Sequence, residues 1–513
     1  MSAATFKPVP HKGLITLSVM LSTIMQVLDT TIANVALPHM QGSLAATQDQ
    51  VSWVLTSYII ASAIMTLPTG WMAGRFGRKK VFLISIAGFT LTSMLCGAAT
   101  SITQMVVFRL AQGAFGAALV PIAQSVMLDI NPKEKHGQAM ALWGLGVMVG
   151  PILGPTLGGY LTEYYNWRWV FYINVPFGLM CFLGIWQFLP DTKPHDRPFD
   201  FFGFFALSLA LGALQLLLDR GQSEDWFQSI EIRIYFMLIL SGTWMYVVHA
   251  AYARHPFLSF EILKDRLFMT AAVFIFFTGI ILLATIALLP PFMQVLMNYP
   301  VIDVGLTLAP RGIGTAVTMV IVGKLLGKVD VRLLIFTGLA LTAYSLWEMS
   351  LFSIFVPEWM FVMTGIVQGF GLGFIFVPLS TIAYSTLPPH TRTEAAGIFS
   401  LMRNLGSSIG VSVVIAMLSG FIQMNHTYLG ESLTVYNVQA LMKVLPPILR
   451  QGSGVGYALL DGELNRQAAL ISYLNDFRFM MWTVIAVMPL IIFLRVPKSK
   501  KPDAENIPAM VAD

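Results

Sequence analysis

The stretch from Phe268 to Pro290 reads FMTAAVFIFFTGIILLATIALLP and contains no charged side chain. A helix needs about 20 mainly apolar residues to cross the hydrocarbon core of a bilayer, so this stretch is long enough to span a membrane. The composition agrees across the chain, because 56% of the 513 residues are hydrophobic and only 11% are charged. Soluble domains carry roughly 25% charged residues. The sequence therefore predicts an all-α integral membrane protein.

The same length criterion, applied outward from this stretch, predicts fourteen transmembrane helices in all. They are expected near 13 to 37, 51 to 72, 81 to 99, 104 to 127, 137 to 161, 169 to 189, 200 to 218, 233 to 252, 268 to 290, 303 to 323, 333 to 352, 359 to 384, 394 to 421 and 477 to 497. The connections are short except for one polar segment, 422 to 476, in which Leu459 to Tyr473 is predicted to form an amphipathic helix.

The rest of the composition argues against several other classes of protein. Cys96 and Cys181 are the only cysteines and both lie in apolar stretches, so we expect neither a disulfide scaffold nor a cysteine-based zinc site. The net charge is +5, but the basic residues form short clusters between apolar runs, which does not indicate nucleic-acid binding. The P-loop pattern Gly-x4-Gly-Lys-Ser/Thr does not occur, so ATP is not expected to act directly. We also find no nucleophile motif that would predict an enzyme.

Lysine and arginine collect in alternate loops between the predicted spans. Arg75 to Lys80, Lys133 with Lys135, and Lys498 to Lys501 all fall on one side, whereas the short loops on the other side hold few basic residues. Positive charge in short loops is retained on the cytoplasmic side of a membrane. Both termini are therefore predicted to be cytoplasmic, and segment 422 to 476 is predicted to lie outside.

Two motifs recur at nearly one offset, which indicates an internal duplication. Gln112-Gly113 in span 4 returns as Gln368-Gly369 in span 12, an offset of 256. Gly70-x-x-x-Gly74-Arg75 returns as Gly323-x-x-x-Gly327-Lys328, an offset of 253. The predicted plan is 6+2+6 spans: an N-terminal half at 13–190, two inserted helices at 199–252, and a C-terminal half at 266–497 that includes the outer loop 422–476.

Five motifs together resemble the major facilitator superfamily, and within it the fourteen-span drug:proton antiporter family of the EmrB and QacA type. They are QVLDTTIANVALP at Gln26 to Pro38, GWMAGRFGRKKV at Gly70 to Val81, RLAQGAFGAA at Arg109 to Ala118, GLGVMVGPILGPTLGG at Gly144 to Gly159, and WRWVFYINVPFG at Trp167 to Gly178. The resemblance covers nearly the whole chain. It implies the major facilitator fold and proton-coupled efflux of lipophilic compounds, driven by the proton gradient without a cofactor or bound metal.

The resemblance also implies a location and partners. It implies the bacterial inner membrane and its lipids, a periplasmic adaptor of the EmrA type, and an outer-membrane channel of the TolC type. The long outer segment is the predicted docking region for the adaptor, and the alternative is a cap over the outer vestibule. Two other functions stay open: a same-fold importer or facilitator for a defined solute, and a membrane-embedded enzyme or receptor.

Ionisable residues inside spans are costly, so each needs a reason to be there. At about 1.5 Å per residue, Asp29 in span 1 and Arg109 in span 4 both lie roughly 8 to 11 Å from the outer end of their spans. We expect the two to meet and Asp29 to exchange a proton as a cavity changes sides. A permanent structural ion pair is the alternative.

Two further arginines, Arg311 in span 10 and Arg403 in span 13, lie near mid-membrane with no acid at their depth. We expect them to line a substrate cavity together with Gln26 and Asn34 of span 1, and to favour acidic or electron-rich cargo. Hydrogen bonding of the arginines to backbone carbonyls is the alternative.

The loop between spans 2 and 3 is predicted to form a cytoplasmic gate. Its expected components are Gly70, Arg75, Gly77 and Arg78, with an arginine pairing with an acid when the gate is shut. The family motif has an aspartate before the first arginine, whereas this chain has Gly74. Asp129, at the cytoplasmic end of span 4, is the candidate replacement. A simple topology anchor is the alternative for the basic residues.

Span 5 carries a glycine every fourth residue and two prolines, which together form the predicted antiporter motif. Its residues are Gly146, Gly150, Pro151, Gly154, Pro155 and Gly158. The spacing leaves one helix face bare, so another helix can approach closely, and the prolines remove backbone hydrogen bonds. We expect a surface that seals during alternating access, with ordinary helix packing as the alternative.

Overall fold

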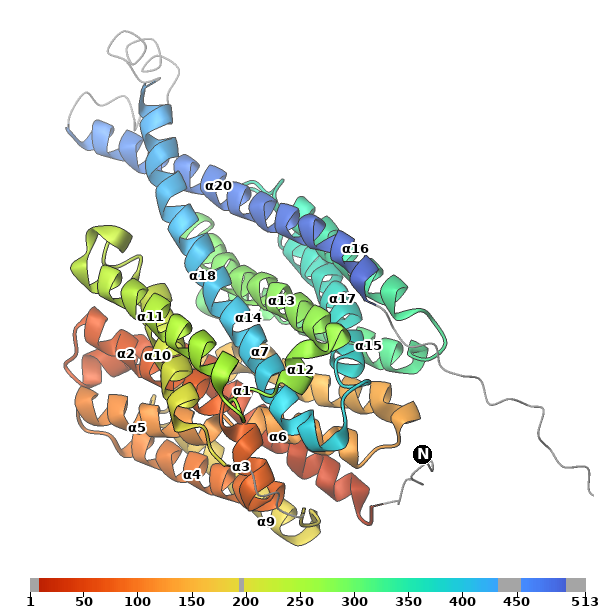
Figure 1. Ribbon diagram of the computed structural model, residues 1–513. Coiled ribbons are helices and arrows are strands. Elements are labelled where there is room, and N and C mark those ends of the chain that lie inside the picture. The colour runs from red at the N-terminus through yellow and green to blue at the C-terminus, as the bar shows by residue number, and fades with distance from the viewer. Residues whose placement is uncertain (1–8, 193–197, 432–453, 495–513) are drawn as a thin grey trace, which may run out of the picture.

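The computed structural model describes residues 9–192, 198–431 and 454–494, which fold into a long bundle of helices (Figure 1). The first half comprises α1 (Lys12–Ser43), α2 (Gln48–Thr66), α3 (Thr69–Phe76), α4 (Arg78–Ala98), α5 (Ile102–Gly116), α6 (Leu119–Asp129), η1 (Lys133–Lys135), α7 (His136–Tyr164), α8 (Trp169–Tyr172) and α9 (Asn174–Phe188). The connecting region comprises α10 (Phe201–Arg220), η2 (Trp226–Gln228), α11 (Ile230–Tyr252) and α12 (Phe260–Lys264). The second half comprises α13 (Arg266–Pro291), η3 (Phe292–Leu296), α14 (Val301–Leu308), α15 (Pro310–Leu325), α16 (Val331–Met349), α17 (Glu358–Ile382), η4 (Pro389–Thr391), α18 (Arg392–Glu431), α20 (Gly454–Val487) and η6 (Met488–Phe493).

Each predicted span falls on one helix or on consecutive helices, apart from residues 495–497 of the last span, which lie outside the described residues. These helices confirm the all-α membrane fold. Among the described residues, twelve helical segments are long and apolar enough to cross a membrane, and the bent pair α2 and α3, with a 53° angle between them, makes up to thirteen. The remaining predicted span, 333 to 352, coincides with the 19-residue helix α16. The chain is a multi-pass membrane protein, and the count of fourteen is consistent with these helices.

The two halves repeat one packing scheme. In the first half α1 packs on α7, α2 on α5, and α4 on α9. In the second half α13 packs on α18, α15 on α17, and α16 on α20. These pairs occupy the same positions in the order of spans, as expected from a duplicated six-span unit.

The halves meet through two of these helices, α7 and α18. Helix α7 packs against α15 and α17 of the second half, where the rings of Trp143 and Phe376 stack at 5.9 Å. Helix α18 packs against α3 and α6 of the first half. The inserted helix α10 contacts both α2 and α18, and α11 packs on α10 at the edge of the bundle. The inserted pair therefore attaches to both halves.

The glycine stripe of α7 faces α1, within the first half. A Cβ placed on Gly158 would lie 2.9 Å from the Ile32 side chain, and one on Gly150 would lie 2.7 Å from the Val27 carbonyl carbon. Thr31 donates a hydrogen bond to the Gly150 carbonyl oxygen at 3.0 Å. The close approach was predicted, but its partner is the helix that carries Asp29, and the surface between the halves lies on another face of α7.

The segment predicted as a long outer loop is largely helical where it is described. Helix α18 has 40 residues, which at about 1.5 Å per residue gives about twice the ~30 Å of a hydrocarbon core. Its last turns pair with the start of α20 through hydrogen bonds of Asn425 to Ser472 and of His426 to Asp461, both at 3.0 Å. We call residues 421–431 of α18 and 454–476 of α20 the arm, which extends from one end of the bundle (Figure 1).

The predicted helix from Leu459 to Tyr473 lies within α20. The other amphipathic stretch in this segment, Val438 to Leu449, lies outside the described residues. The sequence pattern missed that α20 begins well before the predicted last span, because its first turns are polar.

Candidate functional site

Asp29 and Arg109 form an ion pair inside the first half. Nη1 of Arg109 lies 2.6 Å from Oδ2 of Asp29, and both side chains are 0% exposed. Asp29 comes from the middle of α1 and Arg109 from α5, so the pairing predicted from their depth in the sequence is present in the structure. Charges this deeply buried require a partner, since an unpaired one would pay the full cost of desolvation.

Two amides complete the surroundings of the Asp29 carboxylate. The side-chain amides of Gln112 and Asn174 each donate a hydrogen bond to Oδ1 of Asp29 at 2.9 Å. Gln112 also accepts from Nη1 of Arg109 at 2.8 Å. The carboxylate thus receives three donors, an arrangement that stabilises its ionised form. We call Asp29, Arg109, Gln112 and Asn174 the buried network.

Arg109 is held from the side away from Asp29 as well. Its Nε donates to the Val54 carbonyl oxygen at 3.1 Å, and its guanidinium carbon lies 4.2 Å from the centre of the Tyr58 ring. Val54 and Tyr58 both belong to α2, so the network joins α1, α2, α5 and α9. Protonation of Asp29 would weaken its bond to Arg109 and release a cation that α2 also holds.

Sequence reasoning found Asp29 and Arg109 but missed Asn174 and Tyr58 as their partners. Gln112 had a signal, because its match with Gln368 marked the repeat. Asn174 lies in an apolar run at the start of α9, and a single amide in such a run was the available sign in the sequence. The structure shows that its side chain is 0% exposed. Tyr58 gave none, since a tyrosine in a membrane helix is usually explained by packing.

The second half contains the counterpart of this network without the acid. Gln368 donates a hydrogen bond to Thr285 at 3.2 Å, and these residues are 83 positions apart, as are Gln112 and Asp29. Thr285, on α13, therefore stands where Asp29 stands on α1. Thr285 and Gln368 are both 0% exposed. The amide has been kept in both halves, whereas the carboxylate is present in one.

The arginine has changed helix between the halves. A Cβ added to Gly113 would collide with the carbonyl oxygen of Tyr58, and one added to Gly369 would collide with that of Arg311, so Arg311 is the counterpart of Tyr58. Its Nη2 lies 3.4 Å from the Leu282 carbonyl oxygen. Within the described residues, no carboxylate lies within 4.0 Å of Arg311 or Arg403. The second half thus presents cations that lack an acidic partner.

Gln26 and Asn34 lie on α1 at helical spacing, two turns apart. Gln26 is half-buried and donates to the Tyr58 hydroxyl at 3.3 Å, next to the buried network. Asn34 is exposed and donates to the Thr30 carbonyl oxygen at 3.4 Å. Exposure along this face of α1 therefore rises towards the end of the bundle that bears the arm.

The opposite end of the bundle carries the basic loops, and there Asp129 joins the two halves. It accepts from Arg78 at the start of α4, in the same half, and from Nη1 of Arg392 at the start of α18, in the other half, at 2.7 Å. Either Arg75 or Arg78 was predicted to pair with an acid, with Asp129 as the candidate. The structure pairs Asp129 with Arg78, and Arg392 had no signal in the sequence. We call Arg78, Asp129 and Arg392 the gate cluster.

Close packing around the gate cluster brings the two halves together. Ser125 and Thr393 share a hydrogen bond of 2.9 Å, and Tyr384 donates to Gln124 at 3.1 Å, both across the two halves. A Cβ placed on Gly70 would lie 2.6 Å from Cβ of Glu394. This end of the bundle is closed.

The other predicted gate residues have different surroundings. Arg75 is exposed in the last turn of α3, so it lies at the surface of the gate. Gly77 ends that helix with φ of +88°, a conformation that side chains with a Cβ rarely adopt. Gly327 has φ of +87° in the matching loop of the second half. By conformation, the counterpart of Gly327 is thus Gly77, whereas the sequence match had paired it with Gly74.

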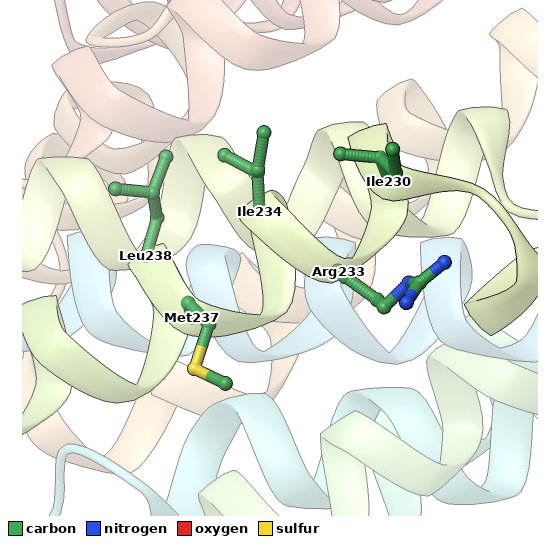
Figure 2. A pocket seen from close by; sticks show the side chains of 5 residues that line it. All are labelled: Ile230, Arg233, Ile234, Met237 and Leu238. Atoms are coloured by element: carbon green, nitrogen blue, oxygen red, sulfur yellow. The ribbon is translucent and has the colours of Figure 1, made fainter.

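A surface hollow on α11 lies outside this site. Figure 2 shows its lining along one side of the helix: Ile230, Arg233, Ile234, Met237 and Leu238. Ile230 and Met237 are strongly exposed. An apolar helix face of this kind on a membrane protein fits contact with lipid. In the described residues, no group of three or more His, Cys, Asp or Glu side chains is arranged to hold a metal ion.

A repeated helix packing scheme and a buried ion pair among many membrane-length helices fit a membrane transporter. A family model of the Major Facilitator Superfamily matches residues 19–411. The chain belongs to the major facilitator superfamily.

Curated relatives narrow this assignment to the EmrB type. The chain is 36% identical to the multidrug export protein EmrB of Haemophilus influenzae, over 85% of this chain and 86% of the relative. It is 33% identical to EmrB of Escherichia coli K12, over 94% and 95%, respectively. It is also 32% identical to the fatty acid resistance protein FarB of Neisseria gonorrhoeae, over 94% and 96%.

Solved structures agree on the fold alone. The human organic anion transporter MFSD10 (TETRAN) superposes with a TM-score of 0.60 at 13% identity, covering 93% of this chain and all of that one. An inward-facing, unoccupied bacterial homologue of the human lysosomal transporter Spinster gives 0.55 at 15% identity, covering 96% and 99%.

Proposed function

We infer that this chain is a multidrug efflux transporter of the EmrB type that exchanges lipophilic cargo for protons by alternating access. The observation that carries the coupling is the Asp29–Arg109 pair at 0% exposure. It is a titratable acid inside a transporter, held by groups from four helices. The proton gradient supplies the energy, and no cofactor takes part.

Asp29 couples the gradient to movement through its charge. When ionised, it is stabilised by Arg109 and two amides, and this state holds α2, α5 and α9 against α1. A proton from outside neutralises Asp29 and weakens these bonds, so another arrangement of the helices becomes accessible. Loss of the proton to the cytoplasm restores the network.

The gate cluster separates the cargo pathway from the cytoplasm in this conformation. The basic end is closed through Asp129 and Arg392, while the polar face of α1 becomes exposed at Asn34 near the other end. Both features support an outward-facing state. In the inward-facing state, Arg392 leaves Asp129 and α18 separates from α3 and α6.

Cargo is selected in part by two arginines, Arg311 and Arg403, that have no acidic partner among the described residues. A weakly acidic or neutral lipophile therefore suits them better than a dication. A relative with the name fatty acid resistance protein supports this cargo class. Gln26 and Asn34 contribute hydrogen bonds from α1.

Location and partners follow from the basic loops and from EmrB-type relatives. We place the chain in the bacterial inner membrane with both termini in the cytoplasm, since positive loops stay inside. The arm then projects outside, where a periplasmic adaptor of the EmrA type and an outer-membrane channel of the TolC type would continue the export path. Met424 and Tyr428 are exposed on the arm, one turn apart, and supply an apolar contact for an adaptor.

Function is tested by a drug-susceptibility panel on a transporter-deficient strain that expresses the chain, followed by transport in inverted vesicles. Export predicts resistance, and cargo uptake into inverted vesicles that stops when the proton gradient is dissipated. Movement of a nutrient in the opposite direction would favour an importer. Turnover of a substrate by detergent-solubilised protein without any gradient would favour an enzyme.

The adaptor contact is tested by replacing Met424 and Tyr428 together with serine. Co-purification of the adaptor and resistance of intact cells should fall, while transport in inverted vesicles survives. Alanine at Gln423 and Thr427, which are exposed polar residues of the same turns, provides the matched control. Loss of vesicle transport with adaptor binding intact would instead make the arm a cap of the transporter.

A further inference from the structure

Asp476 is a second buried acid, and it lies in the half without the ion pair. It is 0% exposed, and neither of its carboxyl oxygens has a hydrogen-bond partner in the structure. It belongs to α20, at the base of the arm. Buried polar groups in proteins are almost always hydrogen-bonded, so an acid with two orphaned oxygens requires an explanation.

The surroundings of Asp476 are apolar and tightly packed. Ala468, Ser472, Asp476, Met480 and Val484 follow one another at four-residue spacing, and each is buried. Ser472 on this face accepts a hydrogen bond from Asn425, so the face points towards α18. Beside this face, on one side of it, the Tyr473 and Phe477 rings lie 5.4 and 6.4 Å from the Phe292 ring.

Among the described residues, no basic side chain pairs with Asp476. Helix α20 packs against α13, η3, α16, α18 and η6. The ionisable side chains that are described on these elements are Arg266 on α13; Arg332, Tyr344 and Glu348 on α16; Arg392, Glu394, Arg403, His426, Tyr428 and Glu431 on α18; and Asp461, Glu463, Arg466, Tyr473 and Arg478 on α20 itself. Within the described part of the chain, none of the basic groups forms an ion pair with Asp476.

We propose that Asp476 is a second proton-binding site, occupied by a proton in this gate-closed conformation. A charge without a partner in a dry, apolar site is far more costly than a neutral carboxyl group. Asp476 therefore keeps its proton as long as α20 packs closely on α18. Loss of the proton creates a charge that only water can stabilise, and water enters only if the two helices separate.

One continuous helix connects this site with the gate. Helix α18 begins at Arg392, which binds Asp129 across the two halves, and its later turns pack against the face of α20 that bears Asp476. Separation of α18 from α20 would thus be transmitted to the gate cluster. This step rests on the proposed function, because it makes the proton bound to Asp476 one of those that the exchanger carries.

Infrared spectroscopy of the purified, cargo-free full-length chain tests the site. At neutral pH, the wild type should show the carbonyl band of a buried protonated carboxylic acid. Asp476→Asn should lose it, whereas Asp29→Asn should keep it because Asp29 is paired with Arg109. No band in the wild type, or an unchanged band in Asp476→Asn, would overturn the proposal. No cargo is needed, so a chain that exports nothing would still show the band, and an exporter without it would leave the proposed function intact.

The link to the gate is tested with spin labels at Lys133 and Lys328, exposed in basic-end loops of opposite halves. Raising the pH should increase the distance between the labels in the wild type. Asp476→Asn, a neutral side chain of similar shape, should keep the distance short over the same pH range. An identical pH profile in both proteins would refute the coupling between Asp476 and the gate.

Discussion

The two halves share one scaffold but hold their charges differently. In the first half Asp29 on α1 meets Arg109 and Gln112, whereas in the second half Thr285 on α13 meets Gln368 alone. In the second half, Arg311 lies on α15, at the position that corresponds to Tyr58 on α2 of the first half. Since the helix pairs are the same, the difference lies in the side chains. The helix packing is the same in both halves, whereas the buried polar side chains differ.

This comparison assigns a separate task to each half. A paired acid suits a proton, because protonation removes its charge, weakens its bond to the arginine and so changes the contacts between the helices that carry the two residues. An unpaired arginine suits a cargo molecule that supplies the missing acid or an electron-rich group. On the proposed function, the first half therefore serves proton coupling and the second serves cargo recognition.

Removal of the arginine should have opposite consequences in the two halves. Arg109→Met leaves Asp29 buried without its cation, which costs about 3–5 kcal/mol of stability. Arg311→Met removes a charge that has no acidic partner, so stability should stay the same or rise. Thermal unfolding of the two purified variants, with the wild type as reference, makes the comparison. A similar loss of stability in both would show that Arg311 has a partner of equal strength.

Closure of the gate should depend on the absence of a side chain at Gly70, which packs against Glu394 of the other half. Gly70→Val places atoms against Glu394 of the other half, and overpacking of this kind costs about 1–3 kcal/mol, which shifts the ratio of closed to open gate about 5- to 150-fold. The spin-label distance between Lys133 and Lys328 should increase. Gly74→Val, where a Cβ has no atom within 4 Å, is the matched control. A closed gate in Gly70→Val would exclude this contact from gating.

Cargo preference should change when the unpaired cation is removed. A hydrogen bond to a charged group contributes about 1.5–3 kcal/mol, so Arg311→Gln should weaken export of acidic lipophiles about 10- to 150-fold and leave neutral ones nearly unchanged. Concentration-dependent transport in vesicles measures this. Arg233→Gln, an exposed arginine of α11, is the control. Equal losses for acidic and neutral cargo would contradict a role in charge recognition.

The smallest effect is expected at the counterpart of Asp29. Thr285→Val removes the neutral hydrogen bond that Thr285 accepts from Gln368 and the one that it donates to the Ile281 carbonyl oxygen, and it should cost about 1 kcal/mol of stability for each. Proton-coupled transport should be unaffected, because Thr285 carries no titratable group. A variant that remains folded but loses coupling would place part of the proton pathway in the second half at Thr285.

Sequence alone predicted the helices, the repeat and the first pair of charges. Asp29 and Arg109 were recognisable because ionisable residues are costly in apolar runs and need a stated reason. Asn174 and Arg392 were not, since an amide in an apolar run and a basic residue at a helix start both have ordinary explanations. Which acid meets which cation across the two halves depends on how the helices pack, and spacing along one chain does not contain that.

The arm and Asp476 show a second limit of sequence reasoning. The polar residues of 422–476 were interpreted as a loop. Hydropathy marks the part of a helix that can lie in lipid, but it does not mark where the helix itself ends. In the structure α18 and α20 continue beyond the apolar stretch and pair with each other. Asp476 was placed one residue before the predicted last span, and its burial became visible only when α20 was seen to pack on α18.

The most direct test of the account is cargo accumulation driven by an imposed proton gradient in proteoliposomes that contain the wild type or Asp29→Asn. Asparagine keeps the shape of the side chain but cannot titrate. The wild type should accumulate cargo against its concentration gradient, whereas Asp29→Asn should only equilibrate cargo between the two sides. Uphill accumulation by Asp29→Asn at the wild-type level would contradict the assignment of proton coupling to the first half.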